Sequence, residues 1–436
     1  MKIRITNARI LTMEEPIGII RGELHVTDNR ITYVGEILKE SELIQDGKPV
    51  EFDRVIDAEG NLLMPGFKNA HTHSAMTFLR SYAEDLPLKE WLYEKVFPME
   101  AKLTPQDIYD LSILGIMEYL TSGITANFDM YMSPEFAAKA SVDCGFRTVI
   151  CGSANDFGGT KESLRREYET LNNYHDLITY ILGFHAEYTT SKELMTDIAD
   201  LAKELRTPVY LHNSETKEEV EGCIERYGMT PTVFLDSIGM FDYGGGGFHC
   251  VHMSSEDLDV CRKRNLYVVT NPGSNTKLAS GIAPISEMLE RKIPVAIGTD
   301  GPASNNCLDM FREMFLVTGL QKLQNMDAQA VSAKEVLKMA TVNGALAMGL
   351  TECDTLSVGK YADLIMIDLC QPNMQPMNNI EKNLVFSGSK QNVKMTMVNG
   401  KILYEDGRFY IGREPKEVYR KANEIIARMT GETREQ

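Results

Sequence analysis

The middle of the chain repeats one unit eight times: a short apolar run followed by a longer stretch in which apolar residues recur at helical spacing. Strands that alternate with helices are typical of a parallel sheet covered by helices. Eight repeats predict that the sheet closes into a (β/α)8 TIM barrel, an α/β fold. The expected strands are GFKNAHTH, ITANFDM, RTVICGS, YILGFHAEY, PVYLHNSE, GGFHCVH, LYVVTNP and PVAIGTD.

The two ends of the chain have a different texture. Residues 1–63 and 353–412 alternate apolar and polar positions between turn residues, which is typical of short antiparallel strands. We therefore expect a small composite β-sandwich built from both chain ends, a barrel domain over residues 64–352, and an amphipathic helix and tail over residues 413–436. One barrel helix is clearly marked, with Thr104 as its N-cap, Pro105 at its first position and Gly123 as its stop.

Composition excludes several classes of protein. A net charge of −17 argues against nucleic acid as a partner, because that binding depends on Lys and Arg neutralising phosphates. The N-terminal residues lack the apolar core of a signal peptide, and we expect no transmembrane helix and no membrane partner. Eight scattered cysteines without a CxxC pair favour free thiols in a reducing cytoplasm. A homo-oligomer is compatible with the sequence.

Most histidines of the chain fall at the ends of the expected strands. Active sites of such barrels are built at the C-terminal ends of the strands. Seven polar residues lie there: His71, His73, His185, His212, Glu215, His252 and Asp300. A single strand histidine is more often a hydrogen-bonded structural residue. His71 and His73, however, share one face of their strand, and two buried rings there need a common partner.

A metal ion would satisfy that pair. His71, His73, His212 and Asp300 together offer three imidazoles and one carboxylate and leave a position for water. This donor set predicts one Zn²⁺ per subunit, with Fe²⁺ as the alternative, and the open position is typical of a catalytic metal.

Several motifs resemble a known family. PGFKNAHTH, HNSE, HCVH and GTDGPASNN resemble the amidohydrolase superfamily, in its order and over nearly the whole chain. HTHSAMTFLR, EDLPLKEWL and NTKLASGIAP resemble its methylthioadenosine/S-adenosylhomocysteine deaminases and the related triazine hydrolases. The resemblance implies a metal-dependent barrel. Binuclear members bridge two metals with a carboxylated lysine on the fourth strand, and YILGFHAEY has no lysine, so a mononuclear site is implied.

The residue types, read with this resemblance, suggest a mechanism. The metal lowers the pKa of bound water and so provides hydroxide. Asp300 ligates the metal and accepts a proton, and Glu215 protonates the ring nitrogen and then the leaving ammonia. We expect His252 to orient the hydroxide, since the family's second HCVH histidine acts and His252 lies nearer the predicted strand end than His249. We interpret His249 as structural.

Three further residues are implied to bind substrate. Trp91 would pack on it, Glu100 would bind ribose hydroxyls, and His185 matches a substrate-binding histidine, although HAEY replaces the family's HxPY. Trp91 lies between His73 and Thr104, in a segment too long for a plain βα loop, and this segment could cover the barrel mouth.

The predicted function is therefore hydrolytic deamination of an adenine nucleoside, of the 5′-methylthioadenosine, S-adenosylhomocysteine, adenosine or 5′-deoxyadenosine type. In the nucleoside deaminases two arginines serve the carboxylate of S-adenosylhomocysteine. Here Cys151 replaces one, and Thr160 and Lys161 follow Gly158-Gly159 where the other is expected, with Lys161 as a partial substitute. An alternative is an aminohydrolase or chlorohydrolase of another heterocycle, of the guanine, cytosine or triazine type. A non-catalytic assembly protein on this fold is disfavoured, because every ligand is retained.

Overall fold

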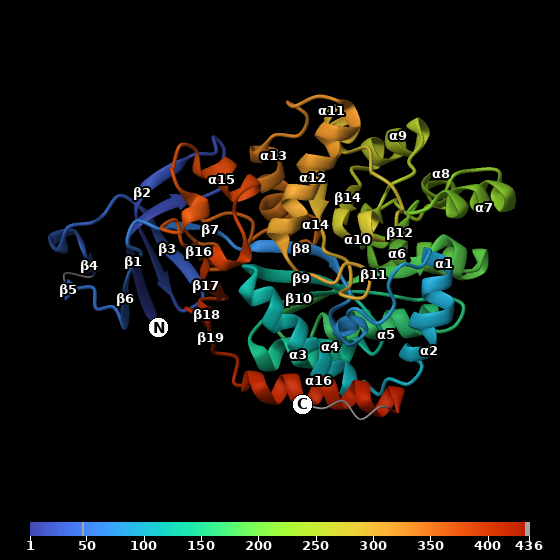
Figure 1. Ribbon diagram of the computed structural model, residues 1–436, viewed down its shortest axis with the longest axis horizontal. Helices are drawn as coiled ribbons and strands as arrows, with labels where there is room; N and C mark the ends of the chain where they lie inside the picture. Colours follow the sequence, from blue (N-terminus) through green and yellow to red (C-terminus); the bar gives the residue numbers. More distant parts are fainter. Residues whose placement is uncertain (46–47, 432–436) are drawn as a thin grey trace.

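The computed structural model describes residues 1–45 and 48–431, and it places the eight predicted strands in one parallel sheet (Figure 1). Their order in the sheet follows the chain. The backbone N–H of Asp300 donates to the His71 carbonyl at 3.0 Å, and the side chain of Asn69 bonds to Thr299, so the last strand meets the first. The predicted (β/α)8 barrel is confirmed. Its strands are β8 (Phe67–Thr72), β9 (Ile124–Met130), β10 (Arg147–Cys151), β11 (Ile178–Ala186), β12 (Val209–Asn213), β13 (Gly245–His249), β14 (Tyr267–Thr270) and β15 (Val295–Ile297).

Helices follow every barrel strand and cover the outside of the barrel (Figure 1). The first of them begins as predicted, with the Thr104 side chain accepting a hydrogen bond from the backbone N–H of Asp107. Gly123 follows its end with φ of 74°, a left-handed conformation that glycine adopts without strain. The helices are α3 (Pro105–Thr121), α4 (Pro134–Cys144), α5 (Lys161–Leu171), α6 (Lys192–Leu205), α7 (Lys217–Tyr227), α8 (Pro231–Ser237), α9 (Ser255–Arg264), α10 (Pro272–Lys277), α11 (Ile285–Glu290), α12 (Met310–Asn325), α13 (Ala333–Lys338), η5 (Met339–Asn343) and α14 (Gly344–Ala347).

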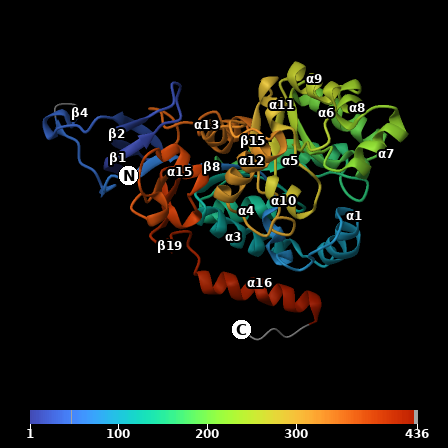
Figure 2. The ribbon, with the colours of Figure 1, turned by 45° about the horizontal axis from the view of Figure 1, so that its top comes forward.

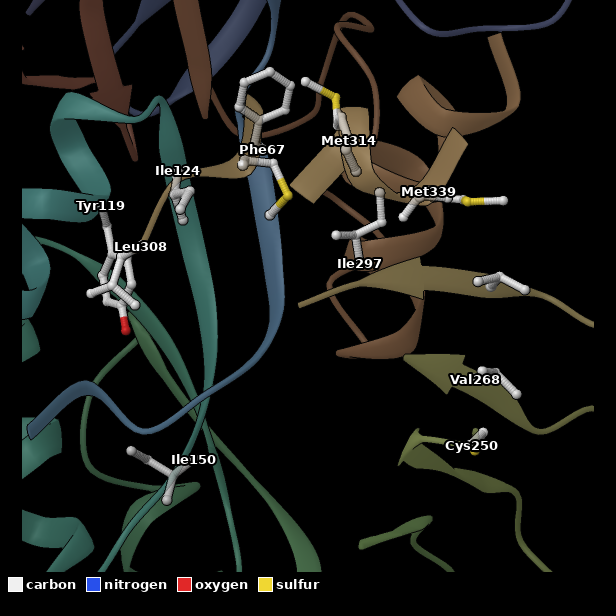
Figure 3. Close-up of a cluster of buried hydrophobic side chains, with 14 of the residues drawn as sticks. Phe67, Tyr119, Ile124, Ile150, Cys250, Val268, Ile297, Leu308, Met314 and Met339 are labelled. Carbon is white, nitrogen blue, oxygen red and sulfur yellow. The ribbon is translucent and has the colours of Figure 1, made fainter. Parts of the chain in front are cut away.

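The main core lies between the barrel and its helices. Figure 3 shows part of it, where Phe67, Ile124 and Ile297 of the strands meet Met314 and Met339 of the helical layer. Alternate strand residues point the other way and fill the barrel interior, as the two-residue period of a strand requires. This second set includes Ala70, Phe128, Val149, Tyr210, Phe248, Val269 and Ala296. The barrel is therefore filled with side chains beneath its C-terminal rim.

The β-sandwich joins both ends of the chain, as predicted. Strand β7 pairs with β1 on one side and with β16 on the other, so N- and C-terminal strands share one ladder. This ladder extends to Pro65, two residues beyond the predicted limit at residue 63. The strands are β1 (Lys2–Leu11), β2 (Ile19–Thr27), β3 (Arg30–Gly35), β6 (Arg54–Asp57), β7 (Leu62–Pro65), β16 (Leu364–Ile367), β17 (Val393–Val398), β18 (Lys401–Glu405) and β19 (Arg408–Phe409), with the turn η1 (Glu40–Glu42) and the separate hairpin β4 (Ile44–Gln45) and β5 (Lys48–Pro49).

Two further segments of the C-terminal part of the chain pack on the barrel domain. The segment between β16 and β17 forms η6 (Pro372–Met374), α15 (Ile380–Phe386) and η7 (Lys390–Asn392), and α15 packs on α12 and α13. Helix α16 (Pro415–Thr430) runs along the margin of the molecule below α3 (Figure 2). Residues 432–436 of the predicted tail lie outside the described residues. No helix in the described part of the chain has the length and hydropathy needed to cross a membrane.

The long segment between β8 and α3 forms the short helical pieces η2 (Ser74–Leu79), α1 (Leu88–Glu90), η3 (Trp91–Val96) and α2 (Phe97–Glu100). Trp91 and Met99 of this segment belong to one buried cluster with Ile425 and Ile426 of α16. The C-terminal helix therefore supports the segment from outside. A further turn, η4 (Glu187–Thr189), follows β11.

Candidate active site

Four histidines and one aspartate converge at the C-terminal ends of the barrel strands. Asp300 Oδ1 lies 3.4 Å from His71 Nε2 and 3.2 Å from His73 Nε2. His73 Nε2 and His212 Nε2 are 3.3 Å apart. His71, His212, His249 and Asp300 each offer one ligand atom, and these four atoms lie within 4.8 Å of one another. We call these five residues the His/Asp cluster. The structure thus brings together the four predicted ligands and adds His249.

The rings of the cluster are held with Nε2 facing inward. Because an amide oxygen can only accept a hydrogen bond, a ring nitrogen next to one must carry the proton. Three Nδ1 atoms donate in this way: His73 to the Met130 carbonyl at 2.5 Å, His212 to the His185 carbonyl at 2.7 Å and His249 to Asn275 Oδ1 at 2.8 Å. Each Nε2 therefore keeps its lone pair for the centre of the cluster, as in histidines that ligate a metal.

His71 shows that the cluster fits a cation. The ring is fully buried and stacks on Phe248, with ring centroids 3.8 Å apart. Neither of its nitrogens has a hydrogen-bond partner among the described residues. Burial lowers the pKa of His71 to about 3, so the ring is neutral near pH 7. Unpartnered buried nitrogens are costly unless a ligand satisfies them, and imidazole nitrogens with one carboxylate suit Zn²⁺.

Asp300 is fixed by two hydroxyl groups. Ser274 Oγ and Ser304 Oγ each donate to Asp300 Oδ2 at 2.7 Å, which leaves Oδ1 facing the histidines. Burial alone would raise the pKa of Asp300, but its contacts with His71 and His73 outweigh burial and hold that pKa well below its usual value. Neither serine is among the predicted site residues, although both follow barrel strands at the active rim, because serine is common in turns and has no spacing that marks it as part of a site.

The structure corrects the expected role of His252. Strand β13 ends at His249, and His249 and Cys250 both have positive φ, 70° and 48°, which turns the chain. His252 Nε2 then donates to the Ser280 carbonyl at 2.7 Å, and His252 is absent from the cavity lining. His249, which we interpreted as structural, occupies the cluster instead. The error arose because we extended the strand through residue 252.

Glu215 lies beside the cluster, as predicted. Its carboxylate is buried, with Oε2 3.8 Å from His249 Nε2 and Oε1 accepting a hydrogen bond from Ser280 Oγ at 3.2 Å. Burial raises the pKa of Glu215 above its usual value. The turn that carries Glu215 is anchored by Glu219, which accepts hydrogen bonds from the backbone N–H groups of Ser214 and Glu215, both at 2.8 Å. A buried carboxyl group with a raised pKa suits proton transfer near neutrality.

A cavity of about 760 Å³ opens onto the cluster. This volume is typical of a small-molecule site. His73, His212, His249, Glu215 and Asp300 form part of its lining. The three predicted substrate-binding residues Trp91, Glu100 and His185 line it as well, so the structure brings them to the same space.

Two of these three residues have defined hydrogen bonds. Glu100 Oε1 accepts from the Tyr131 hydroxyl at 2.7 Å, and within the described chain Oε2 has no partner. His185 Nδ1 lies 2.9 Å from Thr189 Oγ1. Burial lowers the pKa of His185 to about 4, so this ring is neutral near pH 7. Both side chains therefore keep a polar atom for a ligand.

Lys161 does not reach the cavity. Its Nζ lies 2.9 Å from Glu204 Oε1 on helix α6, and Lys161 is absent from the cavity lining. Cys151 does line the cavity. The expectation that Lys161 partly replaces a carboxylate-binding arginine is therefore corrected.

Comparison with known proteins agrees with this geometry. The profile described as "Amidohydrolase family" matches residues 62–403. A protein of Thermoanaerobacter pseudethanolicus named 5-methylthioadenosine/S-adenosylhomocysteine deaminase is 39% identical over 415 residues, which cover 93% of this chain and 94% of that protein. A protein of Methanosarcina mazei named 5'-deoxyadenosine deaminase is 39% identical over 438 residues, covering 98% and 99% of the two chains.

A solved structure is also similar. The crystal structure of an adenosine deaminase from Xanthomonas campestris with bound zinc superposes with a TM-score of 0.91 and 30% sequence identity, covering 99% of each chain. Both the barrel and the composite sandwich of this chain are thus shared with a protein of known structure.

Proposed function

The chain belongs to the amidohydrolase family, and we propose that it is a metal-dependent hydrolase that removes the amino group of an adenine nucleoside as ammonia. The observation that carries this proposal is the buried carboxyl group of Glu215, 3.8 Å from His249 and beside the inward-facing His/Asp cluster. The relatives named as nucleoside deaminases, at 39% identity over nearly their whole length, support the substrate class.

We propose that His71, His73, His212 and Asp300 hold one Zn²⁺, with Fe²⁺ as the alternative. The unpartnered nitrogens of His71 and the short approaches between the other three groups support this set. The zinc named in the similar adenosine deaminase structure supports the choice of metal. A divalent cation bound there supplies Lewis acidity that lowers the pKa of water toward neutrality.

The reaction requires one addition of water and two proton transfers. Water must add to the carbon that bears the amino group, a proton must reach the adjacent ring nitrogen, and a second proton must leave with the amine as the C–N bond breaks. Asp300 accepts the first proton of the water. Glu215, whose pKa is raised by burial, gives its own proton to the ring nitrogen, takes up the second proton of the added water and passes it to the amine. The proton held by Asp300 then returns to Glu215 as the product leaves. His249 accepts a hydrogen bond from water through Nε2 and orients it, the role we had expected of His252.

The substrate contacts follow from the cavity lining. Trp91 offers an apolar ring face for stacking. Glu100 Oε2 accepts hydrogen bonds from ribose hydroxyls, since only Oε1 is occupied by Tyr131. His185 presents its neutral ring to the heterocycle or the sugar.

The test is ammonia release from a panel of 5′-methylthioadenosine, 5′-deoxyadenosine, adenosine, S-adenosylhomocysteine, guanine, cytosine and a chlorinated triazine. We expect an adenine nucleoside to be the best substrate, with one ammonia released per product. Glu215→Gln should lower kcat by about 10²-fold or more, the usual contribution of a general acid or base, while the protein retains its metal. Preference for a triazine, guanine or cytosine, or full activity of Glu215→Gln, would contradict the proposal.

We further propose that the protein works in the cytoplasm. All eight cysteines are free thiols and six of them are buried, which supports a reducing compartment. Cell fractionation followed by immunodetection tests this location.

A further inference from the structure

The charges that line the cavity are of one sign. Four carboxyl groups line it: Glu100, Glu167, Glu215 and Asp300. Within the described residues, no lysine or arginine belongs to the lining. The cavity therefore lacks a fixed partner for an anionic substituent beyond the metal site.

Three lysines that lie close to lining residues along the chain are engaged elsewhere. Each of the three bonds outside the cavity: Lys102 Nζ to the Met429 carbonyl at 2.9 Å, Lys161 Nζ to Glu204 Oε1 at 2.9 Å and Lys277 Nζ to Glu84 Oε2 at 2.8 Å. To reach a ligand, each would have to give up these contacts. These three lysines are therefore held away from the cavity by contacts of their own.

One wall of the cavity provides no member of the His/Asp cluster. It comes from the end of β10, the loop after it and the start of α5, and we call residues 151–167 the outer wall. Its lining combines the apolar residues Cys151, Ala154, Phe157 and Leu164 with the polar but uncharged Ser153, Asn155 and Ser163. Phe157 is 79% exposed and stands at the rim. Because the reacting carbon must lie at the cluster, this wall faces a part of the substrate that does not react.

Glu167 is the charged member of the outer wall. Its Oε2 accepts a hydrogen bond from the Tyr180 hydroxyl at 2.8 Å. Burial raises the pKa of Glu167 above its usual value, and the positive charge of the neighbouring Arg166 offsets this only in part. Arg166 is exposed and does not belong to the cavity lining. A carboxylate that is the only charged group on a wall attracts a cationic group and repels an anionic one.

We propose that the outer wall selects adenine nucleosides whose 5′ substituent is uncharged or cationic, and rejects those whose 5′ substituent is a carboxylate or phosphate. This inference rests on the proposed deaminase function, which places the adenine at the cluster and the ribose near Glu100. An anionic 5′ group would then be desolvated without a cationic partner and close to Glu167, and both effects oppose binding. S-adenosylhomocysteine, which carries a carboxylate, should be a poor substrate for this reason.

The test uses three thioethers that differ in the charge of the 5′ substituent: 5′-methylthioadenosine, a 5′-(2-carboxyethylthio) analogue and a 5′-(2-aminoethylthio) analogue of adenosine. The quantity compared is kcat/KM for ammonia release. We expect the carboxylate analogue to fall about 100-fold or more below methylthioadenosine, since like charges placed together cost several kcal/mol and each 1.4 kcal/mol is tenfold. The amine analogue should stay within about 10-fold of methylthioadenosine, because its charge is matched by the wall.

Two charge-reversal variants locate the effect. Glu167→Lys places a cation on the outer wall, whereas Glu169→Lys makes the same change at an exposed position of the same helix outside the cavity lining. Glu167→Lys should raise the ratio of kcat/KM for the carboxylate and amine analogues by about 10-fold or more, and Glu169→Lys should leave it unchanged. A ratio measured within one enzyme does not depend on the fraction that folds.

The outcomes separate the two proposals. If methylthioadenosine is deaminated and the carboxylate analogue reacts within about 10-fold of it, or if both lysine variants change the ratio equally, the outer wall does not select charge. If none of the three nucleosides releases ammonia, the deaminase proposal fails and this inference fails with it.

Discussion

The two histidines of the HCVH motif provide a sharp test of the site, because the structure gives them different tasks three residues apart. His249 Nε2 faces the His/Asp cluster 3.8 Å from Glu215, while His252 Nε2 donates only to the Ser280 carbonyl at 2.7 Å. We therefore compare His249→Asn with His252→Asn. Asparagine keeps a polar side chain of smaller reach at both positions.

The expected magnitudes follow from these contacts. Loss of one positioned hydrogen-bonding group at a reacting centre costs about 10²–10³ in kcat, or about 2.7–4 kcal/mol of transition-state stabilisation. His249→Asn should lose that much. His252→Asn removes one hydrogen bond at the margin of the site, worth about 0.5–1.5 kcal/mol of folding stability. Ser280 also donates a hydrogen bond to Glu215, so a shift of Ser280 in His252→Asn would disturb Glu215. We therefore expect His252→Asn to lose at most about 10-fold in kcat/KM.

The assay is ammonia release with the best nucleoside of the panel, together with thermal unfolding and metal content for each variant. Both variants should remain folded and retain the cation, so that activity alone separates them. If His252→Asn loses as much kcat as His249→Asn while it keeps its stability and metal, the role returns to His252 and our use of the observed strand end is wrong.

Three further predictions concern the metal, the domain contact and the C-terminal helix. A chelator should abolish ammonia release, and added Zn²⁺ should restore it. The metal-free protein should also unfold at a lower temperature, because a ligand at 100 times its Kd adds about 2.7 kcal/mol to the free energy of unfolding. Full activity without metal would contradict this prediction. Asp363→Asn, at the contact between the sandwich and the barrel, should lower the free energy of unfolding in urea by about 3–5 kcal/mol. The reason is that Arg147 is buried and its Nε lies 2.7 Å from Asp363 Oδ2, so the substitution leaves the guanidinium without its charged partner. A loss below about 1 kcal/mol would argue against this account. Burial alone would raise the pKa of Asp363, but the contact with Arg147 outweighs burial and holds the pKa of Asp363 below its usual value of 3.8. The stability that this ion pair contributes is therefore fully present above pH 3.8 and is lost as the pH falls through the pKa of Asp363 in the folded protein. Ile426→Asp should raise KM for the nucleoside by about 10-fold, because it loosens the buried cluster that supports Trp91. Asn423→Asp, at an exposed position of the same helix, should leave KM unchanged. Equal effects of the two variants would show that packing of Ile426 does not hold Trp91 in place.

The barrel and most of the His/Asp cluster could be predicted from the sequence because both depend on long-range regularities. Apolar runs that alternate with helical segments define parallel strands, and parallel strands place all their C-terminal ends at one rim. His71, His212 and Asp300 come from strands far apart in the chain, yet each lies at its strand end. The presence of these three residues at one rim of the barrel could therefore be predicted without knowledge of any side-chain contact.

The groups that hold the site residues in place could not be predicted in this way. Ser274 and Ser304 fix Asp300, and Asn275 fixes His249, but serine and asparagine are common in turns and carry no pattern of their own. Lys161 shows the same limit for a charged side chain. Its position in the sequence allowed it to reach the cavity, and only its contact with Glu204 shows that it points elsewhere.

The choice between His249 and His252 depended on where one strand ends. Phe248 points into the barrel. If the strand continued, the two-residue period would also bring His252 inward and send His249 outward, which would agree with the predicted role of His252. Positive φ at His249 and Cys250 breaks that period immediately after Phe248 and places His249 over the barrel interior. Neither residue is a glycine or an asparagine, the types that normally signal a left-handed turn, so the sequence carries no mark of the break. Period alone can therefore assign side chains to a face only within a strand, and at the rim, where the chemistry lies, the turn geometry decides which residue enters the site.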